Sequence, residues 1–347
     1  MKNTAIQLPP VQLEKLRDGL PCGGSGSFLS IMPVRWQELS SLLINVSPSQ
    51  PPVVLLNENR RWELVSAYQK SVRRADVQTA LKVVSAFDSM PQHRAYLWRR
   101  LLTTAGEDVG LADPVLVAFA LYCYTIFCKA SPEVQQHVLA YLTVQMCNLK
   151  NRSRVWCSLC VISEKVKACT TLSNPATRVV QSFAQLPAPQ NALHEWLRKK
   201  SWLTEGMSKY VVLDAQWHIQ QVATWSENLV LLHGLPSYAY DMHTRVGRRV
   251  LAMSCEVPEV NEFLKKYAPS KKLEALGWAL FYIEGARIKN ELLDPMLLDV
   301  EQEVAFTALG LNDQGRSDAL HLMHWMVSSG KLDELRKKAI IANYRRV

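Results

Sequence analysis

Helix-start signals recur along this chain, and strand-like alternation of apolar and polar residues is almost absent. From Arg60 onward, apolar residues recur at spacings of three and four, the period of one buried helix face. Three pairs, Asp113-Pro114, Ser131-Pro132 and Asn174-Pro175, each place a capping side chain before a proline. Proline suits the first helical turn because no amide donor is needed there. The sequence therefore predicts an all-α, multi-helix bundle.

The pattern divides the chain into three parts. Residues 1–58 are rich in proline and contain the Gly23–Gly26 cluster, so we expect an irregular segment with one short helix near 35–44. A helical domain is expected at 59–186 and a second one at 190–347, with Pro187-Ala188-Pro189 between them. In the first domain, Asp76 should cap a helix that reaches Ser89, and Pro91 should begin one that stops at Gly106. In the second domain, helices are expected at about 191–199, 211–233, 242–254, 258–267, 271–290, 316–329 and 331–344.

Composition indicates a soluble globular protein. The chain has 347 residues, of which 48% are hydrophobic and 20% charged, enough for about two domains. It contains no uncharged apolar stretch of about 18 residues, so we expect no membrane span. The N-terminus lacks the pattern of a signal peptide, so the protein is expected in the cytoplasm with its eight cysteines reduced.

The net charge of +9 lies mostly in the first two-thirds of the chain. Such an excess fits contact with nucleic acid or another polyanion. The alternative is a basic, soluble protein without a polyanion partner, and charge alone does not separate the two.

Three stretches between residues 60 and 160 carry a family resemblance. Residues 62–73 read WELVSAYQKSVR, residues 96–114 read YLWRRLLTTAGEDVGLADP, and residues 148–153 read NLKNRS. These stretches resemble the region after the ATPase core in the MgsA/RarA family of replication-associated recombination ATPases, which are relatives of the clamp loaders. The resemblance implies a clamp-loader collar-like helical domain that takes part in oligomer assembly close to DNA.

The run 107–114 is the most specific part of the resemblance, and it also has a local explanation. It suits a tight loop between helices, with glycines at the turns and Asp113 capping the next helix. The alternative is that Glu107, Asp108 and Asp113 are functional acids.

The motor of that family has no counterpart here. The phosphate loop G-x-x-x-x-G-K-[ST] is missing, and the Gly23–Gly26 cluster lacks the lysine that would reach the phosphates. The chain before residue 60 is too short for a nucleotide-binding domain. We therefore expect no ATPase activity and no cofactor. A compact, ATPase-free version would suit a bacteriophage or a mobile element.

The segment 238–249 is the strongest candidate for a functional site in the second half. Arg245, Arg248 and Arg249 fall on one face of a helix that Asp241 can cap. Guanidinium groups at this spacing suit phosphate oxygens, and His243 can act as a base or a further donor. A glycine inside that helix, at 247, costs about 1 kcal/mol relative to alanine, which suggests close approach of another backbone or a ligand. The alternative is a solvated basic face.

Glu284 lies in an otherwise apolar run, where an unpaired carboxylate is costly to bury. We expect a buried ion pair with an arginine, with Arg245 or Arg248 as a candidate partner. A catalytic acid is the alternative.

A second basic group lies in the first domain. It consists of Lys70, Arg73, Arg74, Arg99 and Arg100. With Tyr68, Tyr96 and Trp98 nearby, these cations can form a single-strand track with stacking platforms. The alternative places the aromatic rings in the core and the charges in solvent.

No metal site is expected. Cys157-x-x-Cys160 is embedded in a helical apolar pattern, and His321 and His324 lack an H-E-x-x-H context, so core packing beside Trp325 explains them.

Three functional hypotheses follow. The first is a DNA-transaction accessory protein that is not an enzyme, binds single-stranded or forked DNA, replication proteins or both, and assembles as a homo-oligomer. The second is a DNA base- or nucleotide-modifying enzyme that uses Asp241, His243, Arg245, Arg248 and Glu284, which requires these side chains to converge with the arginines inward. The third is an oligomeric interaction module, or an inhibitor of a host replication ATPase.

Overall fold

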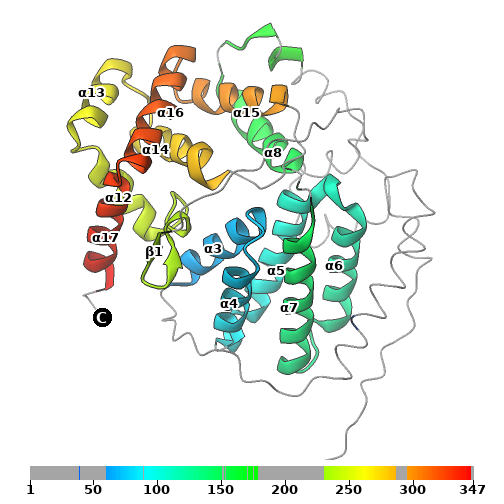
Figure 1. Cartoon of the computed structure of the whole chain (residues 1–347). Coiled ribbons are helices and arrows are strands. Elements are labelled where there is room, and N and C mark those ends of the chain that lie inside the picture. Colours follow the sequence, from blue (N-terminus) through cyan, green and yellow to red (C-terminus); the bar gives the residue numbers. More distant parts are fainter. Residues whose placement is uncertain are drawn as a thin grey trace, which may run out of the picture.

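The computed structural model describes Leu39 and residues 60–178, 230–286 and 295–344, apart from 89, 151, 153, 170 and 175. Within these ranges the chain folds into helices joined by short turns, with one two-stranded hairpin (Figure 1). The prediction of an all-α, multi-helix bundle is confirmed. None of the described helices is long and apolar enough to cross a membrane.

The first group of helices forms a bundle (Figure 1). It consists of α3 (Arg61–Arg73), α4 (Val77–Asp88), η2 (Pro91–His93), α5 (Arg94–Thr104), η4 (Gly110–Ala112), α6 (Pro114–Phe127) and α7 (Pro132–Asn148). Two of its start signals act as predicted. The carboxylate of Asp76 accepts the amide of Thr79 (3.0 Å), and that of Asp113 accepts the amide of Leu116 (2.8 Å).

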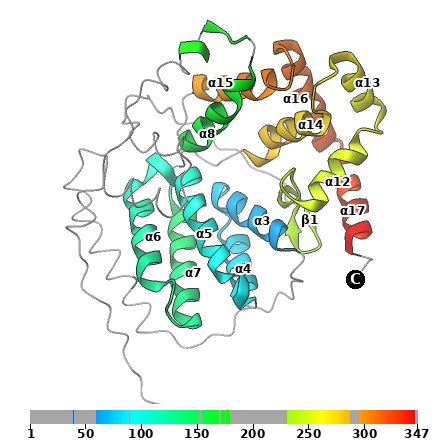
Figure 2. The ribbon, with the colours of Figure 1, turned by 180° about the vertical axis from the view of Figure 1, so that it is seen from behind.

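The second group lies above and beside that bundle, as the view from behind also shows (Figure 2). Its first helices are α8 (Val155–Lys165) and η5 (Val166–Ala168), and its hairpin pairs β1 (Leu231–Leu232) with β2 (Leu235–Pro236) in antiparallel register. The remaining elements are η6 (Ser237–Ala239), α12 (Arg245–Ser254), α13 (Pro258–Tyr267), α14 (Lys272–Leu280), α15 (Pro295–Thr307), α16 (Asp313–Ser328) and α17 (Lys331–Tyr344). Here α8 packs on α15, and α12 packs on α17.

Two helices continue into wide π-helical turns, η3 (Ala105–Val109) after α5 and η7 (Phe281–Gly285) after α14. The predicted stop at Gly106 is therefore wrong, because the turn passes through it and ends at Gly110, whose φ of 44° is left-handed. Both π turns bury a carboxylate, Asp108 in η3 and Glu284 in η7. Such turns are frequent where a helix positions a side chain for a particular role.

Other helix predictions met different outcomes. The ranges 258–267 and 331–344 match α13 and α17, whereas the range 211–233 is wrong at its end because residues 231–236 form the hairpin. Helix α15 was not predicted. The boundary at 187–189, the helix at 191–199 and all of 1–58 except the helical residue Leu39 lie outside the described residues.

Candidate functional site

Helix α3 carries charged side chains that are buried. Glu63, Lys70 and Arg73 are 1%, 2% and 3% exposed. The helix packs on α4, α5 and α7 of its own bundle and on η6 of the second group. Because an isolated charge is costly to bury, each of these groups requires a partner. Several of the partners come from the second group, so α3 is one of the places where the two groups meet.

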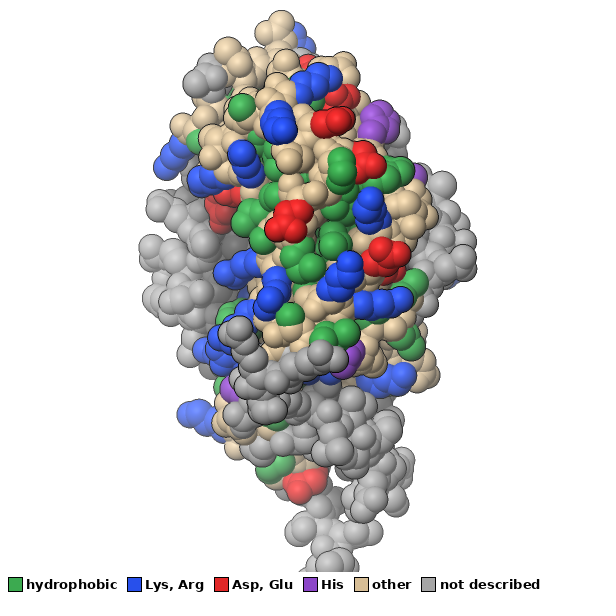
Figure 3. Space-filling view, turned by 90° about the vertical axis from the view of Figure 1, so that its left-hand side faces the viewer, with side chains coloured by type: hydrophobic (Ala, Val, Ile, Leu, Met, Phe, Trp, Pro, Cys, Tyr) green, Lys and Arg blue, Asp and Glu red, His purple; other side chains and the backbone are tan. Residues whose placement is uncertain are grey.

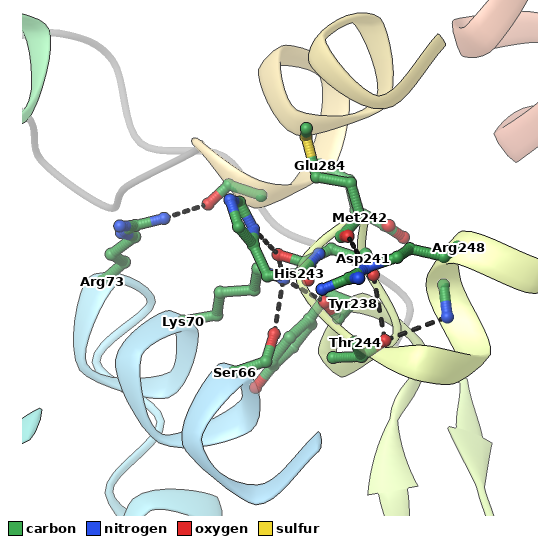
Figure 4. Close-up of polar contacts among 12 residues, drawn as sticks. Ser66, Lys70, Arg73, Tyr238, Asp241, Met242, His243, Thr244, Arg248 and Glu284 are labelled. Atoms are coloured by element: carbon green, nitrogen blue, oxygen red, sulfur yellow. Dashed lines mark hydrogen bonds and ion pairs between the residues drawn. The ribbon is translucent and has the colours of Figure 1, made fainter. Parts of the chain in front are cut away.

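Lys70 is the centre of this contact (Figure 4). Its ammonium donates to the hydroxyl of Ser66 (2.8 Å), the carbonyl oxygen of Tyr238 (2.6 Å) and the carboxylate of Asp241 (2.6 Å). These three bonds use all the protons of the ammonium group. Burial lowers the pKa of Lys70 to about 8, and the charge of Asp241 opposes that shift.

Asp241 belongs to a tight turn before α12. Its carboxylate also accepts the amide of His243 (3.0 Å) and contacts the imidazole Nδ1 of that residue (3.2 Å). Burial raises the pKa of Asp241, but the charge of Lys70 and the bond from His243 outweigh it, so the pKa lies well below its usual range. Thr244, not Asp241, is the N-cap of α12, because its hydroxyl accepts the amide of Gly247 (2.9 Å).

Gly247 has the structural reason that the sequence suggested. A Cβ at this position would lie 1.7 Å from the carbonyl oxygen of Asp241. Any larger residue would collide with the backbone of Asp241, so the close packing of the turn against the start of α12 requires glycine.

Arg73 and Arg74 of the first basic group both make contacts within the protein. Arg73 is ion-paired through Nε with the fully buried Asp108 and donates through Nη1 to the carbonyl oxygen of Gly285 (2.7 Å). The guanidinium of Arg74 lies 4.1 Å from the ring centre of Tyr238. Since Arg73 and Lys70 are both buried and ion-paired, the structure gives them a role in joining the two helix groups.

Glu284 forms a buried ion pair with an arginine, as expected, but the partner is Arg336 of α17. The two groups form a bidentate contact with distances of 3.2 and 2.5 Å. Burial raises the pKa of Glu284, and the charge of Arg336 more than offsets it, so the pKa is lowered. The expected partners Arg245 and Arg248 are wrong, because their side chains are exposed on α12.

A further buried carboxylate, that of Glu301 in α15, was missed. It accepts from Ser158 (2.6 Å) and Tyr282 (3.1 Å) and pairs with Arg154 (3.3 Å). An acid on the apolar face of a predicted α15 would have indicated this buried carboxylate, but the helix itself was not predicted.

The three arginines of α12 remain accessible. Arg245, Arg248 and Arg249 are exposed, and Arg248 Nε donates to the carbonyl oxygen of Met242 (3.2 Å). Burial raises the pKa of Glu63 in α3, and the charge of Arg245 is among the contributions that oppose this shift. Arg245, Arg248 and Arg249 therefore form an exposed basic face on α12.

Helix α17 packs on α12 and exposes Lys337 and Lys338, together with the acid Glu334. Figure 3 shows this side of the molecule, where Lys and Arg side chains are spread over the surface among fewer acids. This face can contact phosphate groups through several separate cations.

The aromatic residues of the first basic group divide into two kinds. Tyr68 and Trp98 are core residues, bonded to Thr143 and Gln135. Tyr96 is only partly buried, and the guanidiniums of the exposed Arg99 and the partly exposed Arg100 lie 5.8 and 5.6 Å from its ring centre, so the three side chains form one surface.

The convergence that the enzyme hypothesis requires is incomplete. Asp241, His243 and Glu284 do gather around the buried Lys70, but Arg245 and Arg248 face solvent. Both acids are ion-paired with buried cations, Asp241 with Lys70 and Glu284 with Arg336, and the imidazole of His243, which is 63% exposed, contacts the carboxylate of Asp241. The arrangement is that of a polar joint between helix groups.

No cluster suited to a metal ion occurs among the residues that the structure describes. His321 and His324 are exposed on α16, so the expectation that they pack in the core is wrong. The thiol of Cys157 accepts a hydrogen bond from Arg154 (3.3 Å).

Comparison with known proteins supports part of the resemblance. An uncharacterized AAA domain-containing protein of Mycobacterium tuberculosis is 29% identical over 111 residues, 32% of this chain and 24% of that protein. Replication-associated recombination protein A of Escherichia coli is 31% identical over 88 residues, 25% of this chain and 20% of that protein. The matched region thus spans about a quarter of the length of the first relative and a fifth of the length of the second. No family model matches it, and no solved structure matches it.

Proposed function

We propose that this chain is an accessory protein of DNA replication, recombination or repair that binds DNA through the exposed arginines of α12. It acts without hydrolysing ATP, and it works on single-stranded or forked DNA, next to replication proteins and as a homo-oligomer. The similarity to replication-associated recombination protein A supports the DNA-related role.

The observation that carries the proposal is the state of Arg245, Arg248 and Arg249. They are exposed on one helix face, whereas other arginines of the molecule, such as Arg73 and Arg336, are buried against carboxylates. Arginine presents a planar fork of donors that matches phosphate oxygens, and neighbouring cations increase the local attraction for a polyanion.

A binding assay at low salt tests the proposal. Fluorescence anisotropy with single-stranded, duplex and forked DNA compares the wild type with Arg245→Ala/Arg248→Ala and with a control, Lys167→Ala, which removes an exposed cation from η5. Loss of both arginines should weaken binding at least about tenfold, which corresponds to 1.4 kcal/mol, while the control binds as the wild type does.

Unchanged affinity in the double variant would remove the α12 face from the account. Absence of all DNA binding, together with stable higher oligomers in light scattering, would instead favour the interaction module.

A further inference from the structure

A second surface combines cations with accessible aromatic rings at the start of α3. Trp62 is 36% exposed, which is unusual for the largest side chain in a helical bundle. The guanidinium of Arg61 lies 5.1 Å from its ring centre. Its ring meets that of Tyr96 edge to face, with centres 5.8 Å apart and planes at 80°. A tryptophan that only filled the core would be covered by its neighbours.

Helix α5 provides the other half of this surface. Tyr96, Arg99 and Arg100 fall at i, i+3 and i+4, so they share one face. Both guanidiniums lie over the tyrosine ring, and Arg100 Nε also approaches the tyrosine hydroxyl at 3.4 Å. Contact with a ring face orients a guanidinium and leaves its N–H groups directed outward. Together with Arg61 and Trp62, these residues form what we call the arginine–aromatic surface.

The charge of this surface is not balanced by acids. Among the described residues, no carboxylate lies within ion-pair distance of Arg61, Arg99 or Arg100, in contrast to Arg73 and Arg336. The nearest acid along the chain after Arg100 is Glu107 of η3, which accepts a hydrogen bond from Gln69 (2.7 Å); the charge of Arg100 acts on this carboxyl, but the two groups form no ion pair. The surface therefore offers three cations and two rings to a ligand that carries both negative charge and flat apolar faces.

We propose that the arginine–aromatic surface binds single-stranded nucleic acid, with unpaired bases stacked on Trp62 and Tyr96 and phosphates held by Arg61, Arg99 and Arg100. Stacking needs bases that are free of a duplex, and every base has a suitable face, so the site selects strandedness and not sequence. This inference rests on the proposed function for its ligand class but uses none of the α12 residues. An acidic peptide would engage the arginines and leave the rings without a role.

The test separates bases from phosphates. Anisotropy measures the binding of an oligothymidine strand, an oligouridine strand, an abasic strand of the same length and a duplex. The proteins are the wild type, Trp62→Ala, Trp62→Phe, Arg99→Ala and the control Leu273→Ala, an apolar residue exposed on α14. Circular dichroism and urea midpoints show which variants remain folded.

Trp62→Ala should weaken binding of the base-bearing strands by about fivefold or more, with little change for the abasic strand or the duplex. Trp62→Phe should restore much of the affinity, because a ring remains. Arg99→Ala should weaken all the charged strands and remains informative if Trp62→Ala does not fold. The two base-bearing strands distinguish DNA from RNA as the preferred ligand.

Equal losses on the base-bearing and abasic strands in Trp62→Ala, or no loss at all, would overturn the inference. The inference would also be overturned if polyglutamate displaced the strands from the wild type and from Trp62→Ala equally well. That result would favour an acidic peptide as the ligand. If Trp62→Ala shows the base-dependent loss while Arg245→Ala/Arg248→Ala binds normally, this inference stands and the α12 face fails.

Discussion

Replacing Lys70 with methionine removes the cation from the centre of the contact between the two helix groups. Methionine retains the length of the side chain and its apolar packing. After the change, the carboxylate of Asp241 stays buried and keeps only His243 as a side-chain partner. The hydroxyl of Ser66 and the carbonyl oxygen of Tyr238 each lose the hydrogen bond that Lys70 donates. Breaking a buried pair in this way costs about 3–5 kcal/mol, mostly because the surviving charge is uncompensated.

Urea unfolding at pH 7, followed by circular dichroism, measures this loss as a shift in the midpoint. Lys266→Met is the matched control, because Lys266 pairs with Asp318 at 3.1 Å on the surface, where its side chain is 64% exposed. The control should leave the midpoint almost unchanged, since exposed pairs contribute little.

A loss below about 1 kcal/mol for Lys70→Met, the range of an exposed pair, would refute the reasoning. The double variant Lys70→Met/Asp241→Leu sharpens the test, because removing both charges should cost less than the sum of the single changes. Additive losses would mean that the two side chains act independently.

Three further predictions concern other parts of the structure. Gly247→Ala should lower the urea midpoint, although alanine normally favours a helix, because its Cβ would lie 1.7 Å from a backbone oxygen; Ala252→Gly, on the exposed face of the same helix, should cost about 1 kcal/mol. Arg336→Met should destabilise by about 3–5 kcal/mol by leaving Glu284 buried and unpaired, and an unchanged midpoint would contradict the pair. Since the pKa of Glu284 is lowered by folding, its contribution is complete above the unfolded value of about 4.5 and is lost as the pH falls through the folded pKa. Unfolding midpoints measured from pH 5 to pH 2 should therefore fall less steeply for Glu284→Gln than for the wild type.

Local signals in the sequence predicted many of the helices. The caps Asp76 and Asp113 each act through a single amide three residues ahead, so their chemistry is contained in a short stretch of chain. Helix α15 begins at Pro295, and the sequence there reads Asp294-Pro295, like the pair at 113–114, so the same sequence rule would have predicted the start of this helix.

Side chains whose partners lie far along the chain were harder to predict. Lys70 and Arg73 read as a basic helix face, and periodicity does not distinguish a face in solvent from one that meets a second group of helices. The partner of Lys70 is 171 residues away and that of Glu284 is 52 residues away. The rule that a buried charge needs a partner predicted the ion pair of Glu284, but it contains no information about which arginine supplies it.

The arginine–aromatic surface was half visible in the sequence. The sequence indicated the part formed by Tyr96, Arg99 and Arg100. It did not indicate Trp62, because this residue fits the apolar spacing of a buried helix face, and that spacing does not show which apolar residue lies at the edge of the core. Its exposure and its contact with Tyr96 depend on how α3 and α5 pack.

The dependence of DNA affinity on salt tests the proposed function most directly. Each phosphate that a cation neutralises releases counterions, so the logarithm of the binding constant falls linearly with the logarithm of the salt concentration, with a slope of about −0.7 per contact on a single strand. The account predicts that Arg245→Ala/Arg248→Ala/Arg249→Ala has a shallower slope than the wild type, by about two units if all three arginines contact phosphates. Identical slopes and affinities for the two proteins would show that the α12 face does not bind DNA.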